Sequence, residues 1–195
     1  MNDGSDLTRD TISRVLDPVS EPVTGDAARA TPAAVLIPLI ETKGTLEVLF
    51  TTRTEHLHDH AGQVSFPGGR VQARDPDPVY TALRESEEEI GLNPARVQVM
   101  GFLKECHTGT GFRVTPVVGY LDRQPELSLD HFEVAEVFQV PLGYFLEPAN
   151  YRRQTVRLQG RQRSFHVFKY ESHTIWGATA GMLVDLRVRL YGGVS

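Results

Sequence analysis

The residues best suited to chemistry lie in one short stretch, where glutamate fills four of five consecutive positions. The stretch reads Arg84-Glu85-Ser86-Glu87-Glu88-Glu89-Ile90-Gly91-Leu92. At about 100° per residue, Glu85, Glu88 and Glu89 project from one side of a helix. Mg²⁺ in proteins is usually held by one or two carboxylates together with water and substrate phosphates. The spacing therefore predicts a metal-phosphate site, and the alternative is a solvated acidic face.

The flanking residues favour a positioned site over a solvated face. Asp77 and Pro78 supply an N-cap and a first-turn proline, and Gly91 supplies a left-handed stop. Ahead of this helix, Phe66-Pro67-Gly68-Gly69 forms a turn without side chains at its end. At such a turn a polyphosphate can approach backbone N–H groups. The opposite helix face carries a mostly apolar stripe made of Val79, Ala82, Leu83, Ser86 and Ile90.

This arrangement resembles the Nudix box, in which a glycine and a spaced glutamate precede Arg-Glu-x-x-Glu-Glu-x-Gly and an apolar residue. Members of that family hydrolyse a diphosphate linked to another moiety, usually with Mg²⁺ or Mn²⁺. The resemblance implies an enzyme with the family's α/β/α sandwich around a mixed sheet. Two positions differ from the pattern. The spacing from Gly69 to Arg84 is one residue longer, with Asp75 near the place of the first glutamate, and Ser86 replaces an apolar residue.

A second resemblance narrows the expected substrate. The segment LFTTRTEHLHDHAGQVSFPGG, residues 49–69, is similar to the one that marks the coenzyme A pyrophosphatase branch of the family. Residues 111–119 (GFRVTPVVG) and 175–180 (IWGATA) are similar to further segments of that branch. Within the marker, Thr54 stands where the branch usually has Ser or Ala, and His58 stands where it usually has Arg.

The second resemblance implies hydrolysis of coenzyme A or its derivatives to 3′,5′-ADP and (acyl-)4′-phosphopantetheine. Because His58 replaces an arginine, and histidine offers no bidentate fork to phosphate, an alternative stays open. That alternative is a Nudix hydrolase of another nucleoside diphosphate derivative, such as ADP-ribose. A more distant alternative is a Nudix-like binding module without activity.

The box implies roles for its charged residues. Glu85 and Glu89 are expected to be the principal metal ligands. Glu88 is expected to bind a second ion or to take the proton of the attacking water, held by Arg84 four residues earlier. A loop acid after the box completes the site in many Nudix proteins, and three candidates are, in order of preference, Glu133, Glu136 and Glu105.

Substrate contacts are expected from backbone and from arginines. Gly68 and Gly69 let the polyphosphate approach the main chain. Arg53, Arg70 and Arg113 are candidates for contacts to phosphates, including the 3′-phosphate that distinguishes coenzyme A from ADP-ribose.

The whole chain fits one soluble enzyme domain. With 195 residues and 40% hydrophobic composition, we expect a single Nudix domain at residues 31–195 behind a flexible lead-in at residues 1–30. A net charge of −5 without a sustained basic face argues against nucleic acid as a partner. The longest apolar run, Ala33–Ile40, is too short to span a membrane. A single cysteine, Cys106, fits a reducing compartment. We expect a cytoplasmic enzyme acting on a small molecule; the sequence does not set its oligomeric state.

Residue patterns predict the elements that position the site. Strands are expected at Ala33–Ile40, Leu46–Arg53, Val97–Lys104, Phe112–Asp122 and Ala135–Pro141, followed by a hairpin made of Tyr151–Leu158 and Ser164–Tyr170. Helices are expected at Pro78–Glu89 and Thr174–Tyr191. Strands interleaved with few helices indicate an α/β (α+β) fold with a mixed sheet covered by helices.

Four other patterns carry weaker functional readings. His56, His58 and His60 alternate as zinc ligands would, and Cys106-His107 are neighbours as in a thiol nucleophile, although a lone cysteine is most often buried. Gly109-Thr110-Gly111 has two glycines of a dinucleotide loop but is more typical of a hairpin turn. The late hairpin concentrates arginines, as a solvated face or as contacts to a substrate phosphate; these are Arg152, Arg153, Arg157, Arg161 and Arg163.

Overall fold

A mixed β-sheet forms the centre of the protein in the computed structural model, which describes residues 7–18, 30–56, 62–158 and 161–192. Strand β1 (Thr31–Thr42) lies in the middle, parallel to β7 (Phe112–Leu121) and antiparallel to β2 (Thr45–Arg53). β5 (Gln98–Phe102) extends the sheet beyond β7, and β8 (Val134–Pro141) pairs with the outer edge of β2. The predicted mixed sheet and its five strands are confirmed, with ends that coincide or differ by one or two residues.

Three short strands that the sequence did not predict are added to this sheet. β3 (Val64–Ser65) pairs with the end of β2, and β6 (Cys106–His107) pairs with β7. β4 (Gly68–Arg70) pairs with the first residues of β1. Strand β1 thus changes its neighbour along its length, from β4 at its start to β2 at its end. The change places the glycine turn of residues 66–69 next to the first half of β1.

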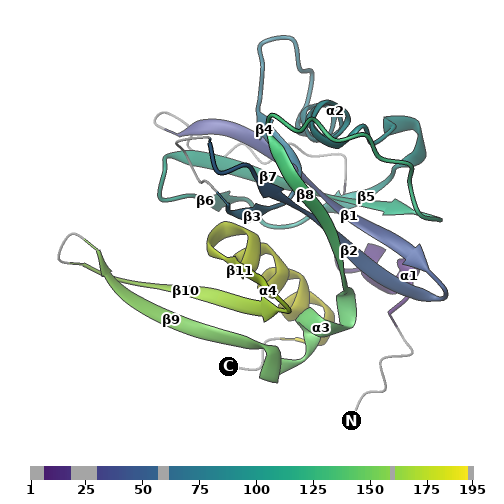
Figure 1. The fold of residues 1–195 in the computed structure, drawn as a ribbon. Helices are drawn as coiled ribbons and strands as arrows, with labels where there is room; N and C mark the ends of the chain where they lie inside the picture. The colour runs from purple at the N-terminus through teal and green to yellow at the C-terminus, as the bar shows by residue number, and fades with distance from the viewer. Residues whose placement is uncertain (1–6, 19–29, 57–61, 159–160, 193–195) are drawn as a thin grey trace.

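One long helix covers each face of the sheet. Helix α2 (Pro78–Ile90) lies on one face and α4 (Gly177–Tyr191) on the other, as Figure 1 shows. Alternate residues of β1 feed two separate cores, because successive side chains in a strand point to opposite faces. Leu36 packs in the core under α2, and Ile37 packs in the core under α4. This is the α/β/α sandwich that the family resemblance implied.

A second, three-stranded sheet follows in the chain. β9 (Tyr151–Leu158) and β10 (Arg161–Tyr170) form the predicted hairpin, and β11 (His173–Trp176) pairs with β10. Because β11 occupies residues predicted as helix, α4 begins at Gly177 and not at Thr174. The short helix α3 (Leu142–Leu146) joins the two sheets, and two 3₁₀ turns lie at Pro94–Arg96 and Pro148–Asn150. None of the helices in the described ranges combines the length and the apolar character needed to cross a membrane.

The N-terminal residues correct one expectation. Residues 7–18 pack against the domain instead of forming a flexible lead-in: helix α1 (Arg9–Ser13) buries Ile12 completely in the core under α4. Asp17 exchanges two backbone hydrogen bonds with Phe102 and forms an ion pair of 2.8 Å with Arg189 of α4. This part of the chain therefore belongs to the folded unit. The other domain limits stay a prediction.

Candidate active site

Helix α2 is fixed at both ends as the sequence predicted. The Asp77 side chain accepts a hydrogen bond of 2.8 Å from the Tyr80 N–H, and Gly91 closes the helix with a φ of 66°. Inside the helix, Ser86 is fully buried and its hydroxyl donates to the Ala82 carbonyl at 2.7 Å. The hydroxyl of Ser86, which replaces an apolar residue of the box, therefore has a hydrogen-bond partner within its own helix. The charged face of α2 is held in a defined orientation.

Arg84 is buried and binds acidic side chains on both sides. Its Nη2 and Nε donate to the two carboxylate oxygens of Asp75 at 2.9 and 3.2 Å, which is the bidentate geometry that guanidinium favours. Its Nη1 lies 2.8 Å from Glu85 and donates to Glu88 at 2.9 Å. The Asp75 side chain has no exposed surface, and the Arg84 hydrogen bonds hold the pKa of its carboxyl well below its usual range. Asp75, which stands near the place of the first glutamate of the box, thus anchors Arg84.

The glycine turn lies directly against the carboxylates of α2. The Gly68 N–H donates to Glu89 Oε2 at 3.3 Å, and Gly68 has a φ of 153°. A Cβ on Gly69 would lie 2.6 Å from the carboxylate carbon of Glu85, so any side chain there would displace that carboxylate. These two glycines therefore permit the main chain to reach the acidic helix face, and their predicted role toward a polyphosphate stays a prediction.

The three glutamates of the predicted wall differ in depth. The Glu88 side chain is 52% exposed and the Glu85 side chain 17%, whereas only 7% of Glu89 is exposed. Burial raises the pKa of Glu89 to about 8, against the hydrogen bond from Gly68, and the charges of Glu85 and Glu133 raise it further. Burial also raises the pKa of Glu85, while Arg84 lowers it. The helical pattern predicted that all three carboxylates face solvent, but the structure buries Glu89.

The loop after strand β7 brings one of the three candidate acids to this site. The Asp130 N–H donates to the Glu89 carbonyl at 2.9 Å, and the charge of Glu133 acts on both Glu85 and Glu89. The other two acids have different partners. Glu136 binds His173 at 3.1 Å, and Glu105 accepts a hydrogen bond of 2.9 Å from Thr115 and pairs with Arg113 at 3.4 Å. The first-ranked candidate is thus the one that the fold brings to the acidic helix face.

The three candidate arginines lie in different surroundings. Arg53, at the end of β2, is close enough to Glu89 to lower its pKa, and its Nε is buried without a hydrogen-bond acceptor among the described residues. Arg70 is exposed, stacks over the Phe112 ring at 5.2 Å, and its carbonyl accepts from Arg84. Arg113 is occupied by Glu105. Arg53 is therefore the candidate with the clearest place beside the carboxylates.

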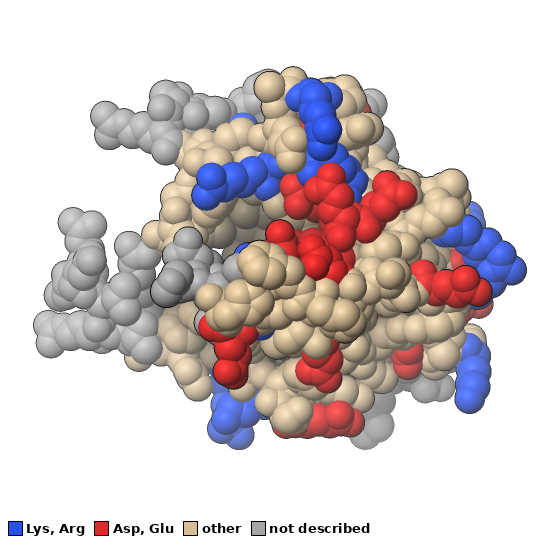
Figure 2. All heavy atoms as spheres, turned by 45° about the horizontal axis from the view of Figure 1, so that its top comes forward, with Lys and Arg blue, Asp and Glu red and all other residues tan. Residues whose placement is uncertain are grey.

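Acidic side chains gather on this face of the protein. Figure 2 shows acidic side chains assembled in one patch bordered by basic ones, on the face that α2 turns toward the viewer. No three His, Cys, Asp or Glu side chains of the described residues already stand close enough to share an ion. The donors are nevertheless all carboxylate oxygens, and the pKa of Glu89 is raised mainly by burial and further by the charges of Glu85 and Glu133. Both properties fit a hard divalent cation.

The other candidate sites do not gain support. His58 and His60 lie outside the described residues, and His56 is exposed. Burial raises the pKa of the Cys106 thiol to about 11, which keeps it protonated at neutral pH and unsuited to nucleophilic attack. Gly109 to Gly111 form the turn between β6 and β7, as expected. In the late hairpin Arg152 and Arg153 are exposed, and the side chains of Arg157, Arg161 and Arg163 fall outside the description.

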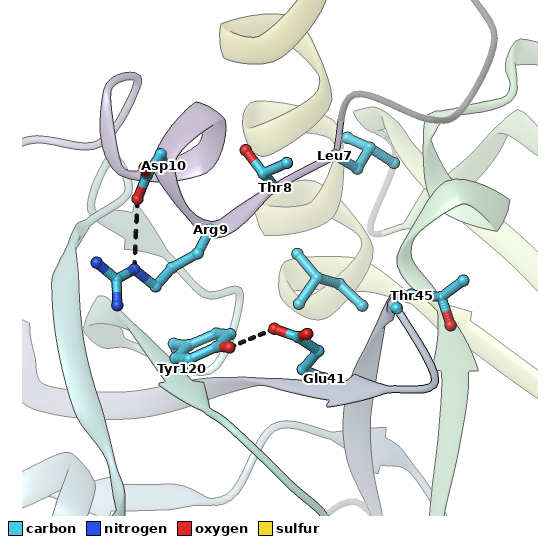
Figure 3. A pocket seen from close by; sticks show the side chains of 9 residues that line it. Leu7, Thr8, Arg9, Asp10, Glu41, Thr45 and Tyr120 are labelled. Carbon is cyan, nitrogen blue, oxygen red and sulfur yellow. Dashed lines mark hydrogen bonds and ion pairs between the residues drawn. The ribbon is translucent and has the colours of Figure 1, made fainter.

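A concavity of about 380 Å³ lies elsewhere, between the N-terminal segment and the turn joining β1 and β2. Its lining includes Arg9, Glu41 and Tyr120 (Figure 3). None of the residues predicted for the active site lines it. The Tyr120 hydroxyl donates to Glu41, and that bond is the main reason that the pKa of Tyr120 rises to about 12. Its polar groups therefore bind one another.

Comparison with known proteins identifies the family. A family model described as the NUDIX domain matches residues 30–148. A protein of Photorhabdus laumondii named "Uncharacterized Nudix hydrolase NudL" is 41% identical over 155 residues, which cover 79% of this chain and 82% of that protein. A protein of the same name from Citrobacter koseri is 35% identical over 188 residues, 96% of this chain and 97% of that protein.

Solved structures agree on the fold. The Nudix hydrolase RenU of M. smegmatis superimposes with a TM-score of 0.51 at 21% identity, covering 61% of this chain and 81% of that one. The Ap4A hydrolase of C. elegans gives a TM-score of 0.50 at 19% identity, covering 57% and 80%. An α/β/α sandwich with an acidic helix facing a glycine turn defines the class as that of Nudix proteins. The chain belongs to the Nudix family and is a Nudix hydrolase of diphosphate substrates, in a family that generally uses divalent ions such as Mg²⁺ or Mn²⁺.

Proposed function

We propose that this protein hydrolyses the diphosphate of coenzyme A or its derivatives, releasing 3′,5′-ADP and (acyl-)4′-phosphopantetheine. The observation that carries the proposal is the place of Arg53, within the segment of residues 49–69 that is similar to the coenzyme A pyrophosphatase marker. Arg53 lies at the end of β2 and its charge acts on Glu89. A cation there is well placed to pair with a phosphate of a substrate whose diphosphate lies over the acidic helix.

In this proposal Glu85 and Glu89 hold Mg²⁺ or Mn²⁺, and Glu133 contributes a further carboxylate. When bound, such an ion neutralises diphosphate oxygens and lowers the pKa of a coordinated water. Glu88, half exposed and held at 2.9 Å by Arg84, is placed to bind a second ion or to accept the proton of the water. Gly68 and Gly69 keep the main chain bare, and Arg70 and Arg113 are further candidates for phosphate contacts.

The proposal is tested by turnover on a panel of coenzyme A, dephospho-coenzyme A, ADP-ribose and a dinucleoside polyphosphate, each with Mg²⁺ and with Mn²⁺. Coenzyme A should give the highest kcat/KM, with 3′,5′-ADP and 4′-phosphopantetheine as products by mass spectrometry. If an arginine pairs with the 3′-phosphate, dephospho-coenzyme A should be about ten- to a hundredfold poorer, because a charged hydrogen bond is lost. Equal cleavage of the two would indicate that the pantetheine arm is recognised instead.

The same panel can overturn the substrate assignment. ADP-ribose cleaved more efficiently than both coenzyme A species would leave a Nudix hydrolase of another nucleoside diphosphate derivative. Absence of hydrolysis on every member, in a folded protein supplied with either ion, would favour a binding module. A parallel preparation of Glu89→Gln controls for contaminating phosphatases, since any activity that survives in it does not belong to this site.

A further inference from the structure

One aromatic ring stands in solvent beside the proposed active site. Phe132 is 65% exposed, more than any other large hydrophobic residue in the described ranges. It directly precedes Glu133, whose charge acts on Glu85 and Glu89. A single exposed hydrophobic residue is common on protein surfaces and by itself means little. What distinguishes this ring is how it is held and what it faces.

The backbone on either side of the ring is fixed to the sheet. Thr54, only 7% exposed, donates its hydroxyl to the Phe132 carbonyl at 2.8 Å and its N–H to the Glu133 carbonyl at 3.1 Å. The Phe132 N–H donates to the Asp130 carboxylate at 2.9 Å. These bonds tie the loop to the end of β2, so the ring projects from an ordered segment. An exposed ring on an ordered backbone is preorganised for binding, because less conformational entropy is lost when a ligand binds.

A second aromatic group faces Phe132 from another part of the chain. The centroid of the His56 ring lies 4.8 Å from that of Phe132, with 58° between the planes. His56 is exposed and follows Arg53 and Thr54 at the end of β2. Two flat groups thus meet at the rim of the site, three residues from the arginine proposed to contact phosphate.

We propose that Phe132 and His56 form a stacking surface for the nucleobase of the substrate, which deepens the function proposed above and rests on it. With the diphosphate over Glu85 and Glu89, the nucleoside end of the substrate reaches outward past Glu133 to this rim. A nucleobase is planar and presents a π-face to an aromatic side chain, whereas the pantetheine arm is flexible and has no such face. Removing one stacking ring is expected to weaken binding roughly five- to a hundredfold.

The test compares ligands with and without the base on matched variants. Dissociation constants for AMP and for ribose 5-phosphate are measured by calorimetry on the full-length protein, its Phe132→Leu variant and its Phe132→Tyr variant. Phe132→Leu should weaken AMP at least fivefold and leave ribose 5-phosphate unchanged, while Phe132→Tyr should retain parental affinity. Tyr191→Leu, an exposed aromatic at the end of α4, is the matched control and should change neither constant.

The kinetic readout follows the same logic. Phe132→Leu should raise KM for coenzyme A with kcat within about twofold, because stacking on a remote part of the substrate stabilises ground and transition states alike. A fall in kcat with unchanged affinity for AMP would overturn the proposal and assign Phe132 to positioning Glu133. Melting temperatures within about 2 °C of the parent confirm that the variants are folded.

Other outcomes also decide the matter. Equal weakening of AMP and ribose 5-phosphate, or parental protein that binds both alike, would overturn base stacking. Weaker inhibition by 4′-phosphopantetheine with unchanged AMP affinity would show that the pantetheine arm covers the ring. Failure to hydrolyse coenzyme A, with AMP still dependent on Phe132, would refute the proposed substrate and leave the stacking surface standing.

Discussion

The side chains of Asp75 and Glu89 are both shielded from solvent beside helix α2, yet their charges are compensated in opposite ways. The Asp75 side chain has no exposed surface and only 7% of Glu89 is exposed. Asp75 receives a bidentate pair of hydrogen bonds from Arg84, which hold the pKa of its carboxyl far below the ordinary value. Glu89 receives one N–H, from Gly68, and burial raises the pKa of its carboxyl to about 8.

The difference agrees with a structural role for Asp75 and with the proposed role of Glu89 as a metal ligand. An ionised group that is buried without a compensating charge destabilises the fold. Ionised Glu89 is such a group, because it is buried next to Glu85 and Glu133. Arg53 offsets only part of this. Asp75 has its cation within the chain and fixes the arginine that in turn holds Glu88. Among the described residues Glu89 has no cation that compensates it as Arg84 compensates Asp75, and this supports the proposal that a divalent ion is its partner.

The largest expected effect is that of removing the ion. Chelation should abolish diphosphate hydrolysis completely, and Mg²⁺ or Mn²⁺ should restore it while Ca²⁺ should not. Mg²⁺ requires near-octahedral geometry at short distance, whereas Ca²⁺ binds longer and more loosely and would misplace the reacting water. Product formation is measured by chromatography after dialysis against chelator. Full activity in excess chelator would remove the distinction drawn between Glu89 and Asp75.

Glu89→Gln should lower kcat about a hundredfold or more while the protein stays folded. The substitution keeps the volume and the contact to Gly68 but removes the charge that the ion needs. Melting curves should show a rise with added Mg²⁺ in the parent and none in the variant. Glu87→Gln, on the exposed side of the same helix, is the matched control and should behave as the parent. Near-parental activity of Glu89→Gln would refute the assignment of Glu89 as a metal ligand.

Asp75→Asn should act mainly on stability. It leaves the buried Arg84 guanidinium without its bidentate acceptor, and a melting temperature lower by about 5–10 °C is expected. Activity should fall by only about tenfold, because Arg84 still binds Glu85 and Glu88. Asp77→Asn is the control, since asparagine caps a helix as well as aspartate does. A loss of activity far beyond tenfold with an unchanged melting temperature would instead indicate that Asp75 is itself a metal ligand.

The sequence predicted the helix and the longer strands around this site better than the burial of its carboxylates. Helix α2 was bounded to within one residue because Asp77, Pro78 and Gly91 are local signals, each acting through its own backbone conformation. Strands β3, β4 and β6 were missed because two or three residues carry no period. The start of α4 was placed three residues early because β11 is too short to interrupt a helical pattern.

The burial of Glu89 was beyond the reach of helical periodicity. Glu89 contacts the Gly68–Arg70 strand on one side and the loop through Asp130 on the other, and neither contact follows from the periodicity of the helix itself. The pairing of Asp75 with Arg84 was likewise not predicted, although the displaced acid near the first glutamate position was the available signal. Phe132 had no signal in the sequence, and His56 was considered only as a zinc ligand, because an exposed ring is recognised only by what lies next to it.

The smallest expected effect concerns pH, where the two carboxylates should act in opposite directions in metal-free protein. The pKa of Glu89 is raised from 4.5 to about 8 in the folded state, so its favourable contribution is full below pH 4.5 and is lost as pH rises through about 8. The pKa of Asp75 is lowered from 3.8, so its contribution is present above pH 3.8 and is lost only as pH falls through the lowered value.

In chelator, Glu89→Gln should therefore gain melting temperature relative to the parent as pH rises from 5 to 8.5, by a few degrees. Asp75→Asn should stay below the parent by a constant amount over the same interval. Added Mg²⁺ should reduce the first difference, because the ion supplies the counter-charge that Glu89 lacks. Parallel pH profiles for Glu89→Gln and the parent would mean that Glu89 is already neutralised within the chain.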